Sequence, residues 1–223
     1  MAKTKDRRPP SAGKDTVRAL TRDRVIEAAL GLIDRDGADS LTMRRLADAV
    51  GVTPMALYNH VSSKQDLLRA VAAHILDDAN FDGGLRGWRA QIEFCFRAFR
   101  AICLRHPGLA RLLETADVAP AAVFIPMDIT VRVLKQAGLS DLDSVRAYFT
   151  LVSFTLVQTA YQSRGPYADL EPSEKIRSER IAGRGYTTVE QLSLPEDWDF
   201  DAAFAFGLRL ILDGVEAAIG REH

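Results

Sequence analysis

Residues 41–68 read LTMRRLADAVGVTPMALYNHVSSKQDLL and contain the start and stop signals of two short helices. Thr42 is a typical N-cap for the first helix, and Gly51 is a typical stop. Thr53 and Pro54 start the second helix, because proline at the first helical position lacks only an N–H group that the helix would leave unpaired. This second helix has room for only about one and a half to two turns, too few to be stable alone. The spacing therefore predicts a helix-turn-helix whose second helix is held by its neighbours.

One further helix is predicted on each side of this motif. Before it, apolar residues at helical spacing end at Gly37, which predicts an amphipathic helix. After it, a helix is expected to begin near Ser63, because Ser63 and Asp66 approximate a capping box. Leu57 and Val61 are the expected inward anchors of the short second helix.

The charge of the chain is unevenly distributed. Residues 1–69 carry 13 Lys and Arg against 9 Asp and Glu, whereas the whole chain has a formal net charge of −1. Only this N-terminal third is electrostatically suited to bind phosphate groups. Within it, residues 1–20 are basic and poor in large apolar side chains, which is typical of a disordered arm. We expect this basic arm to be either a solvated tail or a contact to a nucleic-acid backbone.

The cysteines and the apolar runs indicate the compartment. Cys95 and Cys103 lie in an apolar, helix-like stretch, which favours buried side chains over a disulfide framework or a metal cluster. No apolar run approaches the roughly 20 residues that cross a bilayer, and no apolar segment follows the basic N-terminus as in a signal peptide. The sequence therefore predicts a cytoplasmic protein without a membrane partner.

The glycine pair Gly83–Gly84 precedes longer and more apolar helical patterns, so we expect a domain boundary there. Pro126 predicts a kink or a break in one of these helices. The connection 165–198 is rich in glycine, proline and charge, which is typical of a functional or disordered segment. No segment of consequence has strand periodicity, so the fold class is all-α. The helices are expected at 87–105, 120–137, 142–164 and 200–220.

The helix-turn-helix, with Leu-Tyr-x-His-Val followed by Lys64, resembles the DNA-binding domain of the TetR family over residues 21–78. Segments 103–116 and 120–164 resemble, less specifically, the ligand-sensing domains of tetracycline-repressor-like proteins. The resemblance implies an N-terminal three-helix DNA-binding domain and a larger helical ligand-sensing and dimerisation domain with a four-helix-bundle dimer interface. The expected division is a disordered basic arm at 1–20, a helix-turn-helix DNA-binding domain at 21–80, and a ligand-binding and dimerisation domain at 81–223.

The resemblance also implies which residues contact DNA. Arg44 matches a family position that reaches a base edge, such as guanine, and its alternative is a solvated surface arginine. Tyr58 and Lys64 match a pair that clamps the DNA backbone, although Tyr58 could instead be a half-buried aromatic residue. His60 has no second metal ligand or acid-base partner at a suitable spacing, which favours phosphate contact or packing. The predicted DNA-binding residues are Thr42, Arg44, Arg45, Thr53, Pro54, Met55, Ala56, Tyr58, Asn59, His60 and Lys64.

The C-terminal helices are predicted to supply a homodimer interface and an inducer pocket. Segments 142–164 and 200–220 match the dimerising pair of helices in the family. Gly207 and Gly214 leave a surface without large side chains, a seam where another helix could pack closely; the alternative is that both glycines are simply tolerated within the helix. A mostly apolar small molecule is expected to bind inside each subunit. The alternative for each of its predicted wall residues is an ordinary core position. These residues are Phe99, Cys103, Phe124, Met127, Asp128, Phe149, Thr155, Gln158 and Tyr161.

The function predicted from these features is a transcriptional repressor that leaves a palindromic operator when a small-molecule inducer binds. One alternative is a DNA-binding architectural protein without a sensor, but such a protein would be basic throughout. Another is an enzyme fused to a DNA-binding domain, but no catalytic constellation, metal site or cofactor motif is recognisable, so none is expected. An activator is a third alternative, because the sign of regulation depends on where the operator lies.

Overall fold

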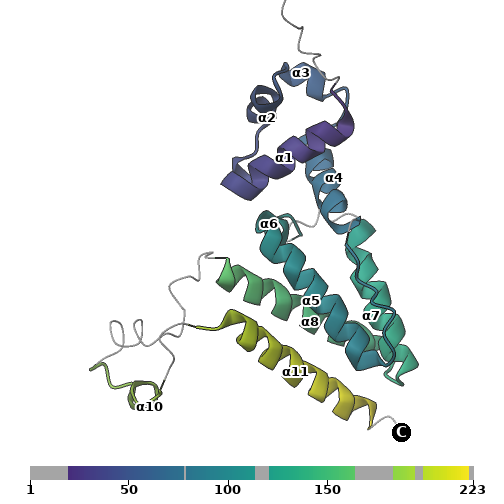
Figure 1. Cartoon of the computed structure of the whole chain (residues 1–223), viewed down its shortest axis with the longest axis vertical. Coiled ribbons are helices and arrows are strands. Elements are labelled where there is room, and N and C mark those ends of the chain that lie inside the picture. Colours follow the sequence, from purple (N-terminus) through teal and green to yellow (C-terminus); the bar gives the residue numbers. More distant parts are fainter. Residues whose placement is uncertain (1–19, 78, 114–120, 164–182, 194–197, 221–223) are drawn as a thin grey trace, which may run out of the picture.

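The computed structural model describes residues 20–77, 79–113, 121–163, 183–193 and 198–220, and within these ranges every regular element is a helix. Helices α1 to α4 gather at one end of the molecule, and a bundle that contains α5, α7, α8 and α11 forms the other end (Figure 1). Nearly all of the predicted basic arm and most of the connection 165–198 lie outside the described residues. None of the described helices is long and apolar enough to cross a membrane.

The first two N-terminal helices begin and end at the residues that the sequence predicts. The third begins at Pro54 as predicted but has only four residues, fewer than the one and a half to two turns expected. The Thr21 side chain caps the first helix by accepting a hydrogen bond from the Arg24 N–H (3.3 Å), and Gly37 ends it with a φ of 82°. Buried apolar side chains hold these helices together, among them Leu57 and Val61, which are the expected anchors. The elements are α1 (Arg22–Asp36), a 3₁₀ turn η1 (Ala38–Ser40), α2 (Met43–Val50), α3 (Pro54–Leu57) and α4 (Lys64–Asp77).

The C-terminal body has α8 at its centre, in contact with α5, α7 and α11. Its inward residues include several hydroxyl groups, and the Thr155 and Thr159 hydroxyls donate to backbone carbonyls of their own helix. The elements are α5 (Trp88–Arg105), α6 (Gly108–Leu113), a 3₁₀ turn η2 (Ala121–Val123), α7 (Phe124–Gln136), α8 (Asp141–Gln162), α10 (Thr187–Glu190) and α11 (Phe200–Ile219).

The sequence predicts a helix over 120–137 with a kink or a break at Pro126, and in the structure the regular α-helix begins only two residues before Pro126. The α-helix begins at Phe124, after the 3₁₀ turn η2, which makes Pro126 its third residue. The first four N–H groups of a helix have no intrahelical partner, so proline costs no hydrogen bond at this position. The Pro126 carbonyl still accepts a hydrogen bond from the Thr130 hydroxyl (2.7 Å).

The two ends of the molecule meet where α6 packs against α1. The His106 ring, between α5 and α6, lies 2.8 Å from the Asp34 carboxylate on α1. Gly108 starts α6 directly against Ile33, and a β-carbon at Gly108 would lie only 2.4 Å from an Ile33 methyl group. Helix α4 also contacts α6 and η2. The body and the N-terminal helices are therefore in direct contact through packed side chains.

Gly207 has a packing partner in its own chain. The Phe154 ring of α8 lies over it, and a β-carbon at Gly207 would come within 2.4 Å of that ring. Phe154 also stacks on Phe204, with ring centroids 5.3 Å apart. The predicted seam for another helix is therefore occupied by α8 of the same chain at Gly207. Gly214 is exposed and has no neighbouring atom at the position of a β-carbon.

We expect Gly207→Ala to lower the free energy of unfolding, because the added methyl group displaces the Phe154 ring. Overpacking of this kind costs about 1–3 kcal/mol, which outweighs the roughly 1 kcal/mol that alanine gains in helix propensity. Gly31→Ala is the matched control, since Gly31 lies inside α1 with open space at its β-carbon position. Urea denaturation should show a less stable Gly207 variant and an equally or more stable Gly31 variant. An equal increase in the free energy of unfolding in both variants would contradict the close packing of α8 on α11.

Candidate functional site

Helices α2 and α3 are joined by a tight turn at Gly51. This residue adopts a left-handed conformation (φ 74°, ψ 35°), and the next N–H, of Val52, donates to the Ala47 carbonyl (3.0 Å). Thr42 and Thr53 cap the two helices by accepting hydrogen bonds from the N–H groups of Arg45 (3.2 Å) and Ala56 (3.4 Å). Both hydroxyls therefore fix a helix start while their side chains stay exposed.

One side of α3 is buried and the other faces solvent. Leu57 is fully buried, whereas Met55 is 76% exposed and Tyr58 is 47% exposed. Ala56, His60 and Lys64 are partly buried, and the remaining predicted residues of this segment are exposed. We call the exposed side the α3 surface; it comprises Thr53, Pro54, Met55, Tyr58 and Asn59.

The adjacent residues Arg44 and Arg45 have different partners. The Arg45 guanidinium binds the Asp36 carboxylate at the end of α1 (2.8 Å) and the Ser40 carbonyl (3.0 Å). Arg44 is exposed and has neither a hydrogen bond nor an ion pair with any residue in the described part of the chain. Arg44 therefore offers an unoccupied guanidinium beside α3, whereas that of Arg45 holds α2 to α1.

A cluster around Asp66 fixes the start of α4. The Ser63 hydroxyl accepts a hydrogen bond from the Asp66 N–H (3.0 Å), as in a capping box. The Asp66 carboxylate, however, accepts from the N–H (2.9 Å) and hydroxyl (3.2 Å) of Ser62 instead of from Ser63. Arg22 completes the cluster: it donates to the His60 carbonyl (2.7 Å) and lies 3.6 Å from Asp66. No local pattern predicts this role of Arg22, because its partners are about forty residues away and only folding brings them together.

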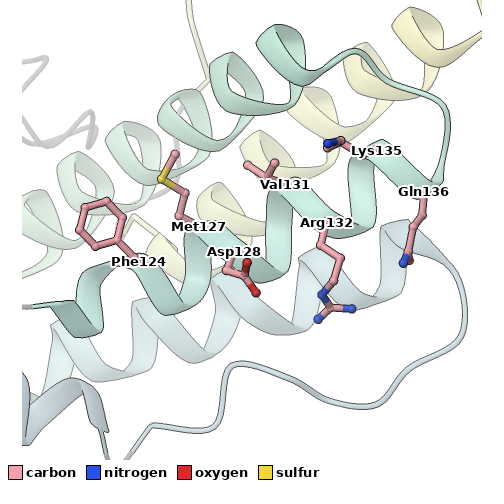
Figure 2. A pocket seen from close by; sticks show the side chains of 7 residues that line it. All are labelled: Phe124, Met127, Asp128, Val131, Arg132, Lys135 and Gln136. Carbon is pink, nitrogen blue, oxygen red and sulfur yellow. The ribbon is translucent and has the colours of Figure 1, made fainter.

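The residues predicted to bind a ligand lie in three different settings. Phe99, Cys103 and Thr155 are buried in the core, and burial raises the pKa of the Cys103 thiol to about 12. Phe149 is exposed, and Gln158 and Tyr161 are partly buried. Phe124, Met127 and Asp128 line an open hollow of about 630 Å³ along α7, together with Val131, Arg132, Lys135 and Gln136 (Figure 2).

A helix-turn-helix on an all-helical body defines a DNA-binding transcriptional regulator. This chain belongs to the TetR family. The family described as bacterial regulatory proteins, tetR family, matches residues 25–71, and the tetracyclin repressor-like C-terminal domain matches residues 82–219.

Three proteins illustrate the similarity. The HTH-type transcriptional repressor DrrR1 of Streptomyces coeruleorubidus is 31% identical, over 97% of this chain and 84% of that protein. The structure of BioQ with its natural double-stranded DNA operator is 31% identical, with a TM-score of 0.66, over 89% of this chain and 99% of that chain. Streptomyces coelicolor ActR, in its structure with actinorhodin, is 27% identical, with a TM-score of 0.72, over 91% of this chain and 99% of that chain.

We expect Asp66→Asn to reduce stability at neutral pH and to have a smaller effect in acid. The backbone N–H of Ser62 is the main cause that holds the pKa of Asp66 below its usual 3.8; the Ser62 hydroxyl and Arg22 add to it, and desolvation opposes it. A carboxylate with a lowered pKa stabilises the fold above its unfolded-state pKa, and this contribution is lost as the pH falls through the folded-state value. Chemical denaturation at neutral pH and below pH 3.8 tests this. The exposed Asp48 provides the control, and a deficit in Asp66→Asn that stays constant with pH would refute the assignment.

Proposed function

We propose that this chain is a dimeric, cytoplasmic repressor that binds a palindromic operator through α2 and α3 and is released by a small molecule bound to its C-terminal body. The single observation that carries the DNA-binding part is the α3 surface, which is exposed on one side and anchored by buried Leu57 on the other. A recognition helix must present this arrangement to the major groove. The repressor function of DrrR1 and the operator bound to BioQ support the same proposal. The division at Gly83–Gly84 then separates a DNA-binding domain from a sensing domain.

The exposed groups near α3 have separate roles in this proposal. Arg44 reaches a base edge, because its guanidinium is exposed and not held by a carboxylate. The Tyr58 hydroxyl donates to a phosphate oxygen, and Lys64 places its ammonium at the start of α4, where the helix dipole also favours an anion. Arg45 acts through α2: its contact with Asp36 holds the helix that crosses the backbone. Thr42 and Thr53 cap their helices and lie next to the phosphates.

The dimer forms through the outward sides of α8 and α11. These sides carry large apolar residues that the subunit leaves exposed, and such clusters mark interfaces. A two-fold axis through them makes a four-helix bundle of two helices per subunit. The same axis makes the operator palindromic, and we expect its half-sites to lie about 34–36 Å apart, one turn of duplex. The exposed residues are Leu142, Phe149, Val157, Phe206 and Leu210.

We expect Arg44→Ala to weaken operator binding by about 1–3 kcal/mol and to relax preference at one base pair, because a base contact is lost. Tyr58→Phe and Lys64→Ala should weaken binding nearly uniformly across sequences. The measurement is a salt-dependent titration against an operator selected from genomic fragments and its single-base variants.

Arg45→Ala is the matched control for Arg44→Ala, since it removes the same charge from the next residue. It should change stability through the lost Asp36 contact but leave base preference unchanged. An Arg44→Ala protein with unaltered affinity and unaltered base preference would show that Arg44 does not read DNA.

The inducer part of the proposal depends on the contact between the two ends of the molecule. A ligand among the α7 residues can change DNA binding only if it moves α6 or α4 against α1, where Gly108 and Ile33 are in close contact. A hundredfold loss of DNA affinity requires about 2.7 kcal/mol of coupling. Actinorhodin bound to ActR supports a small-molecule site in this body.

We expect any inducer of this protein to bind less tightly, by the same factor, when operator DNA is present, because linkage is reciprocal. Actinorhodin and a panel of apolar polycyclic compounds are the probes, and calorimetry with and without operator is the measurement. A compound that weakens operator binding but has equal affinity for the free and DNA-bound protein would contradict allosteric release. A panel in which nothing binds would refute a mostly apolar ligand.

A further inference from the structure

The segment 80–87, between α4 and α5, has no regular secondary structure but is held in place by side chains. Gln91 is buried; its amide oxygen accepts from the Leu85 N–H (3.2 Å) and its amide nitrogen donates to the Phe81 carbonyl (3.3 Å). Phe81 is buried against Phe99, with ring centroids 6.4 Å apart. The side-chain oxygen of Asn80 accepts a hydrogen bond from the Asp82 N–H (3.2 Å), and that of Asp82 accepts one from the Gly84 N–H (3.0 Å). The segment is therefore a preformed wall.

A hollow of about 530 Å³ lies between this wall and the C-terminal half of α7. Its volume falls within the roughly 300–1,000 Å³ of small-molecule sites. It adjoins the hollow of Figure 2, with which it shares Arg132 and Gln136, but it contains none of the residues predicted for the inducer. The lining residues are Asp82, Gly84, Leu85, Gly87, Trp88, Gln91, Arg132, Val133, Gln136 and Ala137.

The charges in this hollow form one adjacent pair of opposite sign. An Arg132 nitrogen lies 3.4 Å from an Asp82 oxygen, and both side chains are about half exposed. Such a pair contributes little to stability, about 0–1 kcal/mol, so each group can exchange its partner for a ligand. A simple anion would meet the Asp82 carboxylate, and a simple cation would meet the Arg132 guanidinium. A ligand that carries a positive and a negative group side by side avoids repulsion from both the Asp82 carboxylate and the Arg132 guanidinium.

We propose that this hollow binds a free α-amino acid with an apolar side chain. The ammonium group faces Asp82 and the carboxylate faces Arg132, with Gln136 as a further donor. The apolar side chain lies against Trp88 and Leu85, of which Leu85 is 47% exposed. Because the segment 80–87 follows α4 directly, an occupant stiffens the connection between the DNA-binding end and the body.

Intrinsic fluorescence provides the test, because the chain has two tryptophans and Trp198→Phe leaves Trp88 as the only reporter. The probes are L-leucine, L-methionine and L-phenylalanine, none of which absorbs at the red edge of the indole band. We expect at least one to cause a saturable change below about 10 mM and to bind at least about tenfold more tightly than its amine and its acid analogues. Calorimetry on the unsubstituted full-length chain repeats the measurement.

The Asp82→Asn and Arg132→Gln variants should each weaken binding at least about tenfold. Arg35→Gln is the matched control, since Arg35 forms an exposed ion pair of the same length, 3.4 Å, far away on α1. Thermal melting checks that all three variants are folded. No saturable binding by any probe, equal binding of the amine and acid analogues, or undiminished binding by Arg132→Gln would each overturn the proposal. None of these outcomes bears on operator binding, so the proposed function is tested separately.

Discussion

Helix α3 comprises only Pro54–Leu57, and a helix of this length closes too few hydrogen bonds to be stable in water. Its position depends on the burial of Leu57 and Val61 beneath it and on the Thr53 cap at its start. The same burial turns Met55 and Tyr58 toward solvent, because they lie on the opposite side of a single turn. The surface available to DNA is thus a consequence of packing, in which α2 is the helix that makes the main contact with α3.

The connection between this DNA-binding end and the body has two kinds of contact. Helix α4 continues into segment 80–87, which Gln91 holds to α5, while α6 meets α1 through the His106–Asp34 pair and the Gly108–Ile33 contact. A glycine at the latter position permits an approach that no larger residue allows. Close packing of this kind leaves no gap between α6 and α1 at this contact.

The polar groups of the body divide into those already bonded and those that are available. Thr155, which is predicted to orient a ligand, donates its hydroxyl proton to the Leu151 carbonyl (2.8 Å), so it has no donor left for a ligand. Asp128, Arg132 and Gln136, by contrast, are exposed along α7. Arg132 and Gln136 border both hollows and Asp128 borders the larger one, so the available polar side chains of the body lie on α7 and not in the interior of α8. The hollow of Figure 2 reaches Phe124, the residue next to η2, and η2 packs on α4.

The sequence alone determined the starts of the first three helices and the stops of the first two. Thr21, Thr42 and Thr53 each cap the backbone N–H three residues ahead, and Gly37 and Gly51 adopt positive φ angles that end α1 and α2. Such interactions join residues that are close in the sequence, so local sequence patterns predict them. Only the tertiary structure decided which arginine is available: Arg44 and Arg45 are adjacent and chemically identical, and α1 places Asp36 beside Arg45 alone. The tertiary structure likewise packs Phe154 against Gly207 and places Arg22 beside the Asp66 carboxylate. These partners lie 44 or more positions apart, and their proximity follows from how the helices pack, which helical periodicity does not specify.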